Sequence, residues 1–118
     1  MATDPYVPRA DRAVVPPAKL RDYALNPEHE TGRHKARLFS AELGIGRNDW
    51  RYLAERLSVG VRTTPASRIE IDAYGVSYEV VMPVDGLNGA TVPVVSAWFV
   101  EHNSQDPPRL VSAYVFRP

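Results

Sequence analysis

The sequence predicts an α+β fold in which N-terminal helices pack on a four-stranded antiparallel meander sheet. Up to about residue 58, apolar residues recur every three or four positions, which is the spacing of an amphipathic helix. After Gly60 they alternate with polar residues, which is the spacing of a half-buried strand. Because the helices come first and the strands follow as one run, the two kinds of element should form separate layers.

Three helices are expected before the strands. The first covers residues 17–25, because proline suits a first helical turn and the pair Asn26-Pro27 ends a helix. The second starts at residue 31 or 32 and stops at the segment Gly-Ile-Gly that follows residue 43. The third begins after Asn48, a residue type favoured at helix N-caps.

The first 16 residues are expected to lie apart from this domain. They carry three of the eleven prolines and show no apolar periodicity, which favours an extended arm. Residues 17–118 then form a single α+β domain, since a chain of 118 residues can bury one modest core.

Four strands with tight turns are expected after the helices. They cover residues 68–73, 76–82, 91–100 and 109–116. The pair Asn88-Gly89 is favoured in two-residue hairpin turns, and Tyr74-Gly75 offers a second turn. With two-residue turns at both places, Glu79 lies opposite Trp98, and Glu70 lies opposite Glu79.

This register sorts the strand side chains into two faces. The face expected to meet the helices is formed by Ile69, Ile71, Tyr78, Val80, Val95, Ala97, Phe99, Val111, Ala113 and Val115. The opposite, polar face is formed by Arg68, Glu70, Ser77, Glu79, Ser96, Trp98, Ser112 and Tyr114. Side by side, Glu70 and Glu79 would repel one another, so this register needs a nearby cation, a shared proton or a slip.

Composition limits the function classes. Fourteen basic residues balance fourteen acidic ones, so contact with a nucleic acid must come from local clustering. The chain has no cysteine, which excludes disulfides and thiol catalysis, and its three histidines lack the spacing of a zinc site. We therefore expect no metal and no cofactor. No apolar run approaches the roughly 20 residues that span a bilayer, so we expect a cytoplasmic protein without membrane contact, with delivery into a target cell left open.

Basic residues cluster where the second helix begins. Arg33, His34, Lys35 and Arg37 lie near free backbone amides, which already favour an anion. The helix dipole favours acidic residues there, so the basic cluster breaks a local rule, and such breaks indicate function. The function that fits is phosphate binding. The alternative is a solvated helix start in which Arg37 pairs with Glu30, and both interpretations stay open.

The polar sheet face offers partners for such a site. Trp98 and Tyr114 could stack on bases, and the neighbouring serines could bind a phosphate. Lys35 lies four residues before Phe39, at the edge of the apolar stripe, from where its flexible stem can reach the sheet. We therefore expect Arg33, His34 and Lys35 to face the same opening as Trp98, Ser112 and Tyr114. The alternative is a half-buried face that the N-terminal arm covers.

The chain resembles a small bacterial domain family of unknown function, whose members occur alone or as C-terminal domains of polymorphic toxins. The resemblance covers about residues 11–115. It rests on the stretch AVVPPAKLRDYALNPEHETGRHKARLFSAELGI, the turn at Tyr74-Gly75, the segment NGATVPVVSAW and the ending PRLVSAY. Lys35 matches the lysine of the family's Gly-x-x-Lys-Ala segment. Ser112 and Tyr114 match the hydroxyl and the aromatic residue of its last strand. Helices before a four-stranded meander also resemble the barnase, colicin and RelE-type ribonucleases.

The resemblance implies a metal-independent endoribonuclease toxin or toxin-like domain, which cleaves RNA by attack of a ribose 2′-hydroxyl. Its expected partners are RNA, with tRNA as one candidate, and a cognate antitoxin or immunity protein. The residues assigned to this function are His34, Lys35, Glu79, Ser112 and Tyr114 for catalysis, and Arg33 and Trp98 for substrate binding. Lys35 and Arg33 would balance charge on the phosphate, and His34 or Glu79 would transfer protons.

A second function remains open from the sequence. The proline-rich N-terminus and the lack of an unmistakable acid–base pair also suit a non-catalytic binding module. Such a module would be an immunity or antitoxin-type partner, or a small assembly protein.

Overall fold

The computed structural model describes residues 5–118 and confirms the predicted α+β fold. Its helices come first: α1 (Pro17–Lys19), a π-helical turn (Leu20–Ala24), α2 (Arg33–Leu43) and α3 (Trp50–Thr63). Short 3-10 turns form at Ala10–Arg12 and Arg47–Asp49. The strands follow: β1 (Arg68–Ile71), β2 (Gly75–Asp85), β3 (Thr91–Glu101) and β4 (Arg109–Val115).

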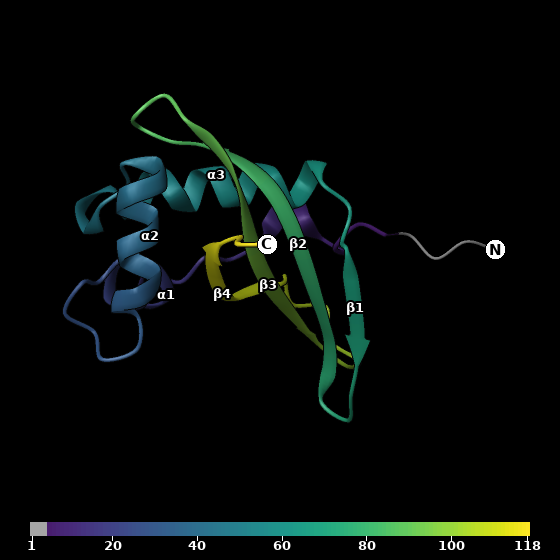
Figure 1. Cartoon of the computed structure of the whole chain (residues 1–118). Coiled ribbons are helices and arrows are strands. Elements are labelled where there is room, and N and C mark those ends of the chain that lie inside the picture. Colours follow the sequence, from purple (N-terminus) through teal and green to yellow (C-terminus); the bar gives the residue numbers. More distant parts are fainter. Residues whose placement is uncertain (1–4) are drawn as a thin grey trace.

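The strands form one antiparallel sheet in the order β1-β2-β3-β4, which is the predicted meander. The helix α3 lies against β2, whereas α1, the π-helical turn and α2 contact β4. Figure 1 shows the result: α2 and β1 stand at opposite ends of the molecule, and α3 runs behind the long β2–β3 hairpin. The β4 edge of the sheet is therefore the edge at which α2 can meet strand side chains.

The core lies between the helices and one face of the sheet. Its largest fully buried side chains include Trp98 from β3 and Phe39 from α2. The indole Nε1 of Trp98 donates to Ser96 Oγ at 2.9 Å, and that hydroxyl donates to the Val80 carbonyl at 2.9 Å. Both polar groups are thus satisfied, as burial requires.

The predicted register between β2 and β3 is wrong by one residue. Tyr78, and not Glu79, lies opposite Trp98. The connection spans residues 86–90 rather than two residues, because Leu87 N donates to the Leu43 carbonyl at 2.8 Å and so ties the loop to α2. A slip by one residue turns every side chain of a strand to the other face. The core face of β3 is therefore Val94, Ser96 and Trp98, while Ala97 and Phe99 face outward.

The predicted register between β1 and β2 is also wrong. Glu79 lies opposite Arg68, and Glu70 lies opposite Ser77. The turn is centred one residue earlier than expected, because Asp72 N donates to the Gly75 carbonyl at 3.0 Å. The Asp72 carboxylate supports this turn by accepting bonds from Tyr74 N at 2.7 Å and Gly75 N at 3.0 Å. The expected repulsion between two glutamates does not arise, because the two are no longer opposite one another, and Arg68 forms an ion pair with Glu70. All four residues of β1 are exposed, including the isoleucines that were expected in the core.

On β4 the prediction is correct for every position except one. Ala113 and Val115 are buried, and Ser112 and Tyr114 belong to the outer face. Val111 is 46% exposed, because the pairing shifts between Ala97 and Trp98 and leaves it out of the regular alternation.

The described part of the N-terminal segment packs against the body. Val7 is buried, and Val14 forms a parallel bridge with Arg109. Residues 1–4 of the expected arm lie outside the described residues, and the division at residue 16 stays a prediction.

Candidate functional site

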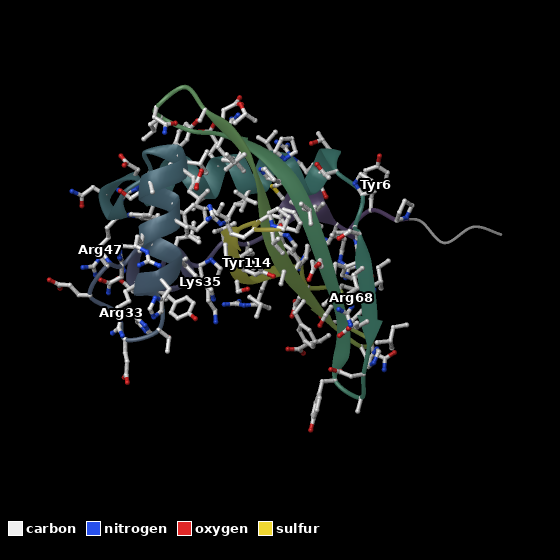
Figure 2. The ribbon with its side chains drawn as sticks, viewed as in Figure 1. Tyr6, Arg33, Lys35, Arg47, Arg68 and Tyr114 are labelled. Atoms are coloured by element: carbon white, nitrogen blue, oxygen red, sulfur yellow. The ribbon has the colours of Figure 1, made fainter. Side chains whose placement is uncertain are left out.

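Lys35 and Tyr114 meet where α2 passes the β4 edge of the sheet. The Lys35 ammonium lies 5.8 Å from the centre of the Tyr114 ring, within the range of a cation–π contact. In Figure 2 both side chains occupy the gap between α2 and the sheet. They line a hollow of about 250 Å³ together with His34, Leu38, Val115 and Arg117. Tyr114 is 37% exposed, so one wall of the hollow is an accessible aromatic surface.

Tyr23 completes this cluster from a third element. Lys35 Nζ donates to the Tyr23 hydroxyl at 3.0 Å and lies 4.6 Å from the centre of its ring. The hydrogen bond from Lys35, followed by one from Thr31, lowers the pKa of the Tyr23 hydroxyl below its ordinary value. Tyr23 sits in the π-helical turn, which Leu25 N closes by donating to the Leu20 carbonyl at 2.8 Å. Such turns are common at functional sites.

His29 holds the loop that leads into α2. Its Nδ1 accepts bonds from Thr31 N at 3.1 Å and Gly32 N at 3.0 Å. Its ring packs edge-on against Tyr23, with 4.7 Å between the ring centres. Gly32 lies so close to Tyr23 that a Cβ there would overlap the Tyr23 carbonyl oxygen. These contacts fix where α2 starts relative to Tyr23, and hence the direction in which Lys35 points.

The positive charge of Lys35 is not balanced by a carboxylate. The ion pairs found within residues 5–118 join Arg21 and Arg47 to Asp22, Arg56 to Glu55, Arg68 to Glu70, and Arg117 to Glu42. None of them includes Lys35, Arg33, His34 or Arg37. The pair between Arg37 and Glu30, which belonged to the alternative interpretation, is therefore not formed, and no carboxylate within residues 5–118 balances these charges at the start of α2.

Ser112 and Glu79 lie on the same outer face of the sheet. Both are paired with Ala97, Ser112 from β4 and Glu79 from β2, so the two are separated by two strand spacings, roughly 10 Å. Ser112 is two residues from Tyr114 on the same face of the sheet, but it does not line the Lys35 hollow. Glu79 instead lines a separate hollow of about 190 Å³ with Arg68, Glu70, Ser77, Tyr78 and Ala97.

The placement predicted for Trp98 is wrong. The side chain was expected on the polar face, but it is fully buried and bonded to Ser96. The error follows from the slipped register, which turned the whole of β3 over. A buried indole cannot stack on a base, so Tyr114 is the aromatic surface of this site.

The shared direction predicted for Arg33, His34 and Lys35 is also wrong. Arg33 lines a different hollow, on the face of α2 turned away from the sheet, and Figure 2 shows it there beside Arg47. His34 borders both hollows. The reason is helical geometry: at about 100° per residue, Arg33 and Lys35 point about 160° apart.

Sequence reasoning missed Tyr23 and His29. Neither belongs to the apolar periodicity that defined the helices, and Tyr23 lies 12 residues before the lysine that it contacts. The Tyr23 hydroxyl reaches the Lys35 ammonium only because the loop between the π-helical turn and α2 folds back on itself.

Two other features are absent from the described part of the chain. Residues 5–118 contain no group of three or more histidine, cysteine, aspartate or glutamate side chains that could hold a metal ion. None of the helices among these residues is both long and apolar enough to cross a membrane.

The chain matches one family model and is similar in fold to a solved structure. A family model described as "Domain of unknown function (DUF6883)" matches residues 6–117. No curated protein matches the chain. Among solved structures, the fold is similar to a chain of a contact-dependent growth inhibition toxin–immunity protein complex from Klebsiella pneumoniae 342. The TM-score is 0.67 at 19% identity, and the match covers 93% of this chain and 98% of that one. At this identity the similarity shows the fold.

Proposed function

The chain belongs to the family described as "Domain of unknown function (DUF6883)", and from the geometry around Lys35 we propose that it is a metal-independent endoribonuclease that acts as a toxin or toxin-like domain. The substrate is RNA, with tRNA as one candidate class. The reaction takes place in the cytoplasm, either of the producing cell or of a cell into which the domain is delivered.

One observation carries this proposal. Lys35 presents an ammonium without a carboxylate partner beside an accessible aromatic ring and a hydroxyl of lowered pKa, at the edge of an open sheet face. The two tyrosine rings offset part of the cost of holding the ammonium there, but no carboxylate within residues 5–118 balances its charge. A bound phosphodiester would supply the missing negative charge, and Tyr114 would supply a stacking surface for an adjacent base.

The proposed chemistry is an internal transfer of the phosphoryl group. The ribose 2′-oxygen bonds to the adjacent phosphorus as its proton passes to a base, and the 5′-oxygen leaves as it receives a proton from an acid. The products are a 2′,3′-cyclic phosphate and a 5′-hydroxyl end. Lys35 stabilises the extra negative charge of the phosphorane, which is the step at which a fixed cation contributes most.

Residues in and near the hollow take the remaining roles. His34 borders the hollow and is assigned to proton transfer. Tyr23, whose hydroxyl accepts the hydrogen bond from Lys35 Nζ at 3.0 Å, holds the ammonium in place. Ser112 and Tyr114 position the phosphate and the base. Glu79 lies two strands away from Ser112, so we assign proton transfer to His34 and not to Glu79.

The test is cleavage of total RNA by purified protein in the presence of a chelator, with the new ends identified chemically. Lys35→Ala should slow cleavage by about 10²–10³-fold, the usual cost of losing one fixed transition-state donor. Arg62→Ala, which removes an exposed positive charge at the far end of α3, is the matched control and should cleave normally. Equal rates in the two variants, or ends carrying a 5′-phosphate, would contradict the proposal.

A second function, that of a non-catalytic binding module of the immunity type, is favoured by the β1 edge of the sheet. Ile71 and Tyr74 are 74% and 80% exposed, and among residues 5–118 the strand β1 has a neighbouring strand on one side only. Such an edge can accept a strand from a partner protein. Expression of the chain alone in bacteria separates the two functions. A toxin arrests growth and is neutralised by a cognate immunity protein, whereas an immunity-type module leaves growth unchanged.

A further inference from the structure

The face of α2 opposite Lys35 forms a second hollow, larger than the first. It has a volume of about 600 Å³ and lies between α2, the end of the π-helical turn and the segment before α3. Its lining residues are Leu25, Pro27, Arg33, His34, Ala36, Arg37, Ser40, Ala41, Gly46 and Arg47. Three of these side chains carry a permanent positive charge, and none carries a negative one.

The three arginines are held differently. Arg47 is anchored, since its Nε donates to the Arg21 carbonyl at 2.8 Å and its Nη2 lies 3.4 Å from the Asp22 carboxylate. Arg33 and Arg37 are exposed and form no ion pair within residues 5–118. They stand one helical turn apart on the same side of α2, which separates their Cβ atoms by about 5–6 Å. The hollow is therefore lined by two guanidinium groups without an ion pair, those of Arg33 and Arg37, and by the anchored guanidinium of Arg47.

Basic residues at the start of α2 lower the stability of this helix. The first turn of α2 contains no acidic residue, although the helix dipole favours one there. Charges concentrated without internal partners are typical of a surface that meets an anionic ligand. Because the charges line a hollow with apolar walls at Leu25 and Pro27, the ligand should combine negative groups with flat apolar parts.

We propose that this hollow, which we call the arginine hollow, binds the phosphodiester backbone of the RNA strand beyond the bond that is cleaved. The inference rests on the proposed function, because it takes RNA as the ligand. His34 borders both hollows, so one strand can pass over the start of α2 from Lys35 to the arginines without leaving the protein surface. The spacing of Arg33 and Arg37 suits successive phosphates, and the apolar wall suits a ribose or a base.

The experiment measures binding of a 2′-O-methylated RNA oligonucleotide, which cannot be cleaved, by fluorescence anisotropy over a series of salt concentrations. The double variant Arg33→Ala with Arg37→Ala should bind roughly tenfold more weakly, as the loss of hydrogen bonds to charged groups implies. The slope of log affinity against log salt should fall by about 1.4, which is about 0.7 for each lost phosphate contact with a single strand. The control is Arg12→Ala with Arg62→Ala, which removes the same charge outside both hollows.

Each outcome decides one question. If the double variant and the control bind alike, or if the wild-type protein does not bind the oligonucleotide at low salt, the inference is wrong. If polyglutamate binds through Arg33 and Arg37 while RNA does not, the ligand is an acidic protein and the inference is again wrong. If RNA binding needs both arginines but unmodified RNA is never cleaved, the proposed ribonuclease fails while the arginine hollow stands. Replacement by glutamine, which keeps the side-chain length, checks that the loss does not come from helix disruption.

Discussion

The positively charged side chains on the two faces of α2 differ in their contacts with the rest of the protein. On the sheet side, Lys35 is half-buried, bonded to Tyr23 and stacked near Tyr114, so its ammonium has one fixed position. On the far side, Arg33 and Arg37 are exposed and have no ion pair within residues 5–118. A charge held in one position can stabilise a transition state, whereas exposed charges without internal partners can bind a long, flexible ligand.

The first prediction tests this difference by measuring the rate of RNA cleavage and the affinity for RNA separately. Lys35→Ala should lower the single-turnover rate of RNA cleavage at saturating protein by about 10²–10³-fold. Arg33→Ala with Arg37→Ala should leave that rate within roughly threefold and raise the Kd, because uniform binding energy does not lower the chemical barrier. Single-turnover kinetics over a range of protein concentrations measure both quantities. A rate loss of similar size on both faces would mean that α2 has one extended site and not two.

The sequence predicted the fold well because the fold depends on periodicity. Each helix and strand appears close to its expected range, since the period of apolar residues changes clearly after Gly60. Register was predicted poorly, because it depends on the position of the β1–β2 turn and on the length of the β2–β3 connection. The loop at residues 86–90 is set by its bond to Leu43 at the end of α2, a contact 44 positions away that no local signal reveals.

The candidate site was predicted in part, for the same physical reason. Lys35 and Tyr114 do lie together, because their positions depend on the edge of the α2 stripe and on the alternation of β4. Trp98 was misplaced because its position depended on the β3 register. Tyr23 could not be found, because its hydroxyl reaches Lys35 through a turn whose path is set by Gly32 and His29.

The second prediction concerns Gly32, which sets the start of α2 and hence the direction of both faces. A methyl group at this position would overlap the Tyr23 backbone carbonyl, which is part of a packed turn and cannot move freely. Gly32→Ala should therefore lower the free energy of unfolding by about 1–3 kcal/mol, the usual cost of overpacking. Urea denaturation measures it. Gly46→Ala is the control, because the nearest atom to an added methyl group there is the Asp49 Oδ2, at 3.6 Å. A loss of equal size at both glycines would contradict the close approach.

The third prediction compares two histidines that lie five residues apart. His29→Ala removes the acceptor of two backbone N–H groups in the loop before α2, so the free energy of unfolding should fall by about 1 kcal/mol, as for a lost helix cap. His34 is exposed, and no hydrogen bond was found for its side chain within the described residues, so His34→Ala should change stability by less than about 0.5 kcal/mol. RNA cleavage should show the reverse order. Urea denaturation and cleavage rates measured on the same samples test both statements, and equal stability losses would remove the assigned role of His29.

The smallest expected effect is electrostatic and concerns the titration of Tyr23. The hydrogen bond from Lys35 is the largest cause of its lowered pKa, because a nearby ammonium stabilises the tyrosinate form. Since the pKa is lower in the folded than in the unfolded protein, the associated stability is fully present above the unfolded-state pKa and is lost as the pH falls through the folded-state pKa. Ultraviolet titration of tyrosinate should show one early-titrating residue, which Tyr23→Phe removes.

Lys35→Met should raise that pKa towards the ordinary value, while the bond from Thr31 keeps part of the shift. Arg33→Met should leave the titration unchanged, because its guanidinium lies on the other face of α2. Equal shifts from both variants would show that Tyr23 responds to the general charge of the helix start, and the contrast between the two faces of α2 would then be lost.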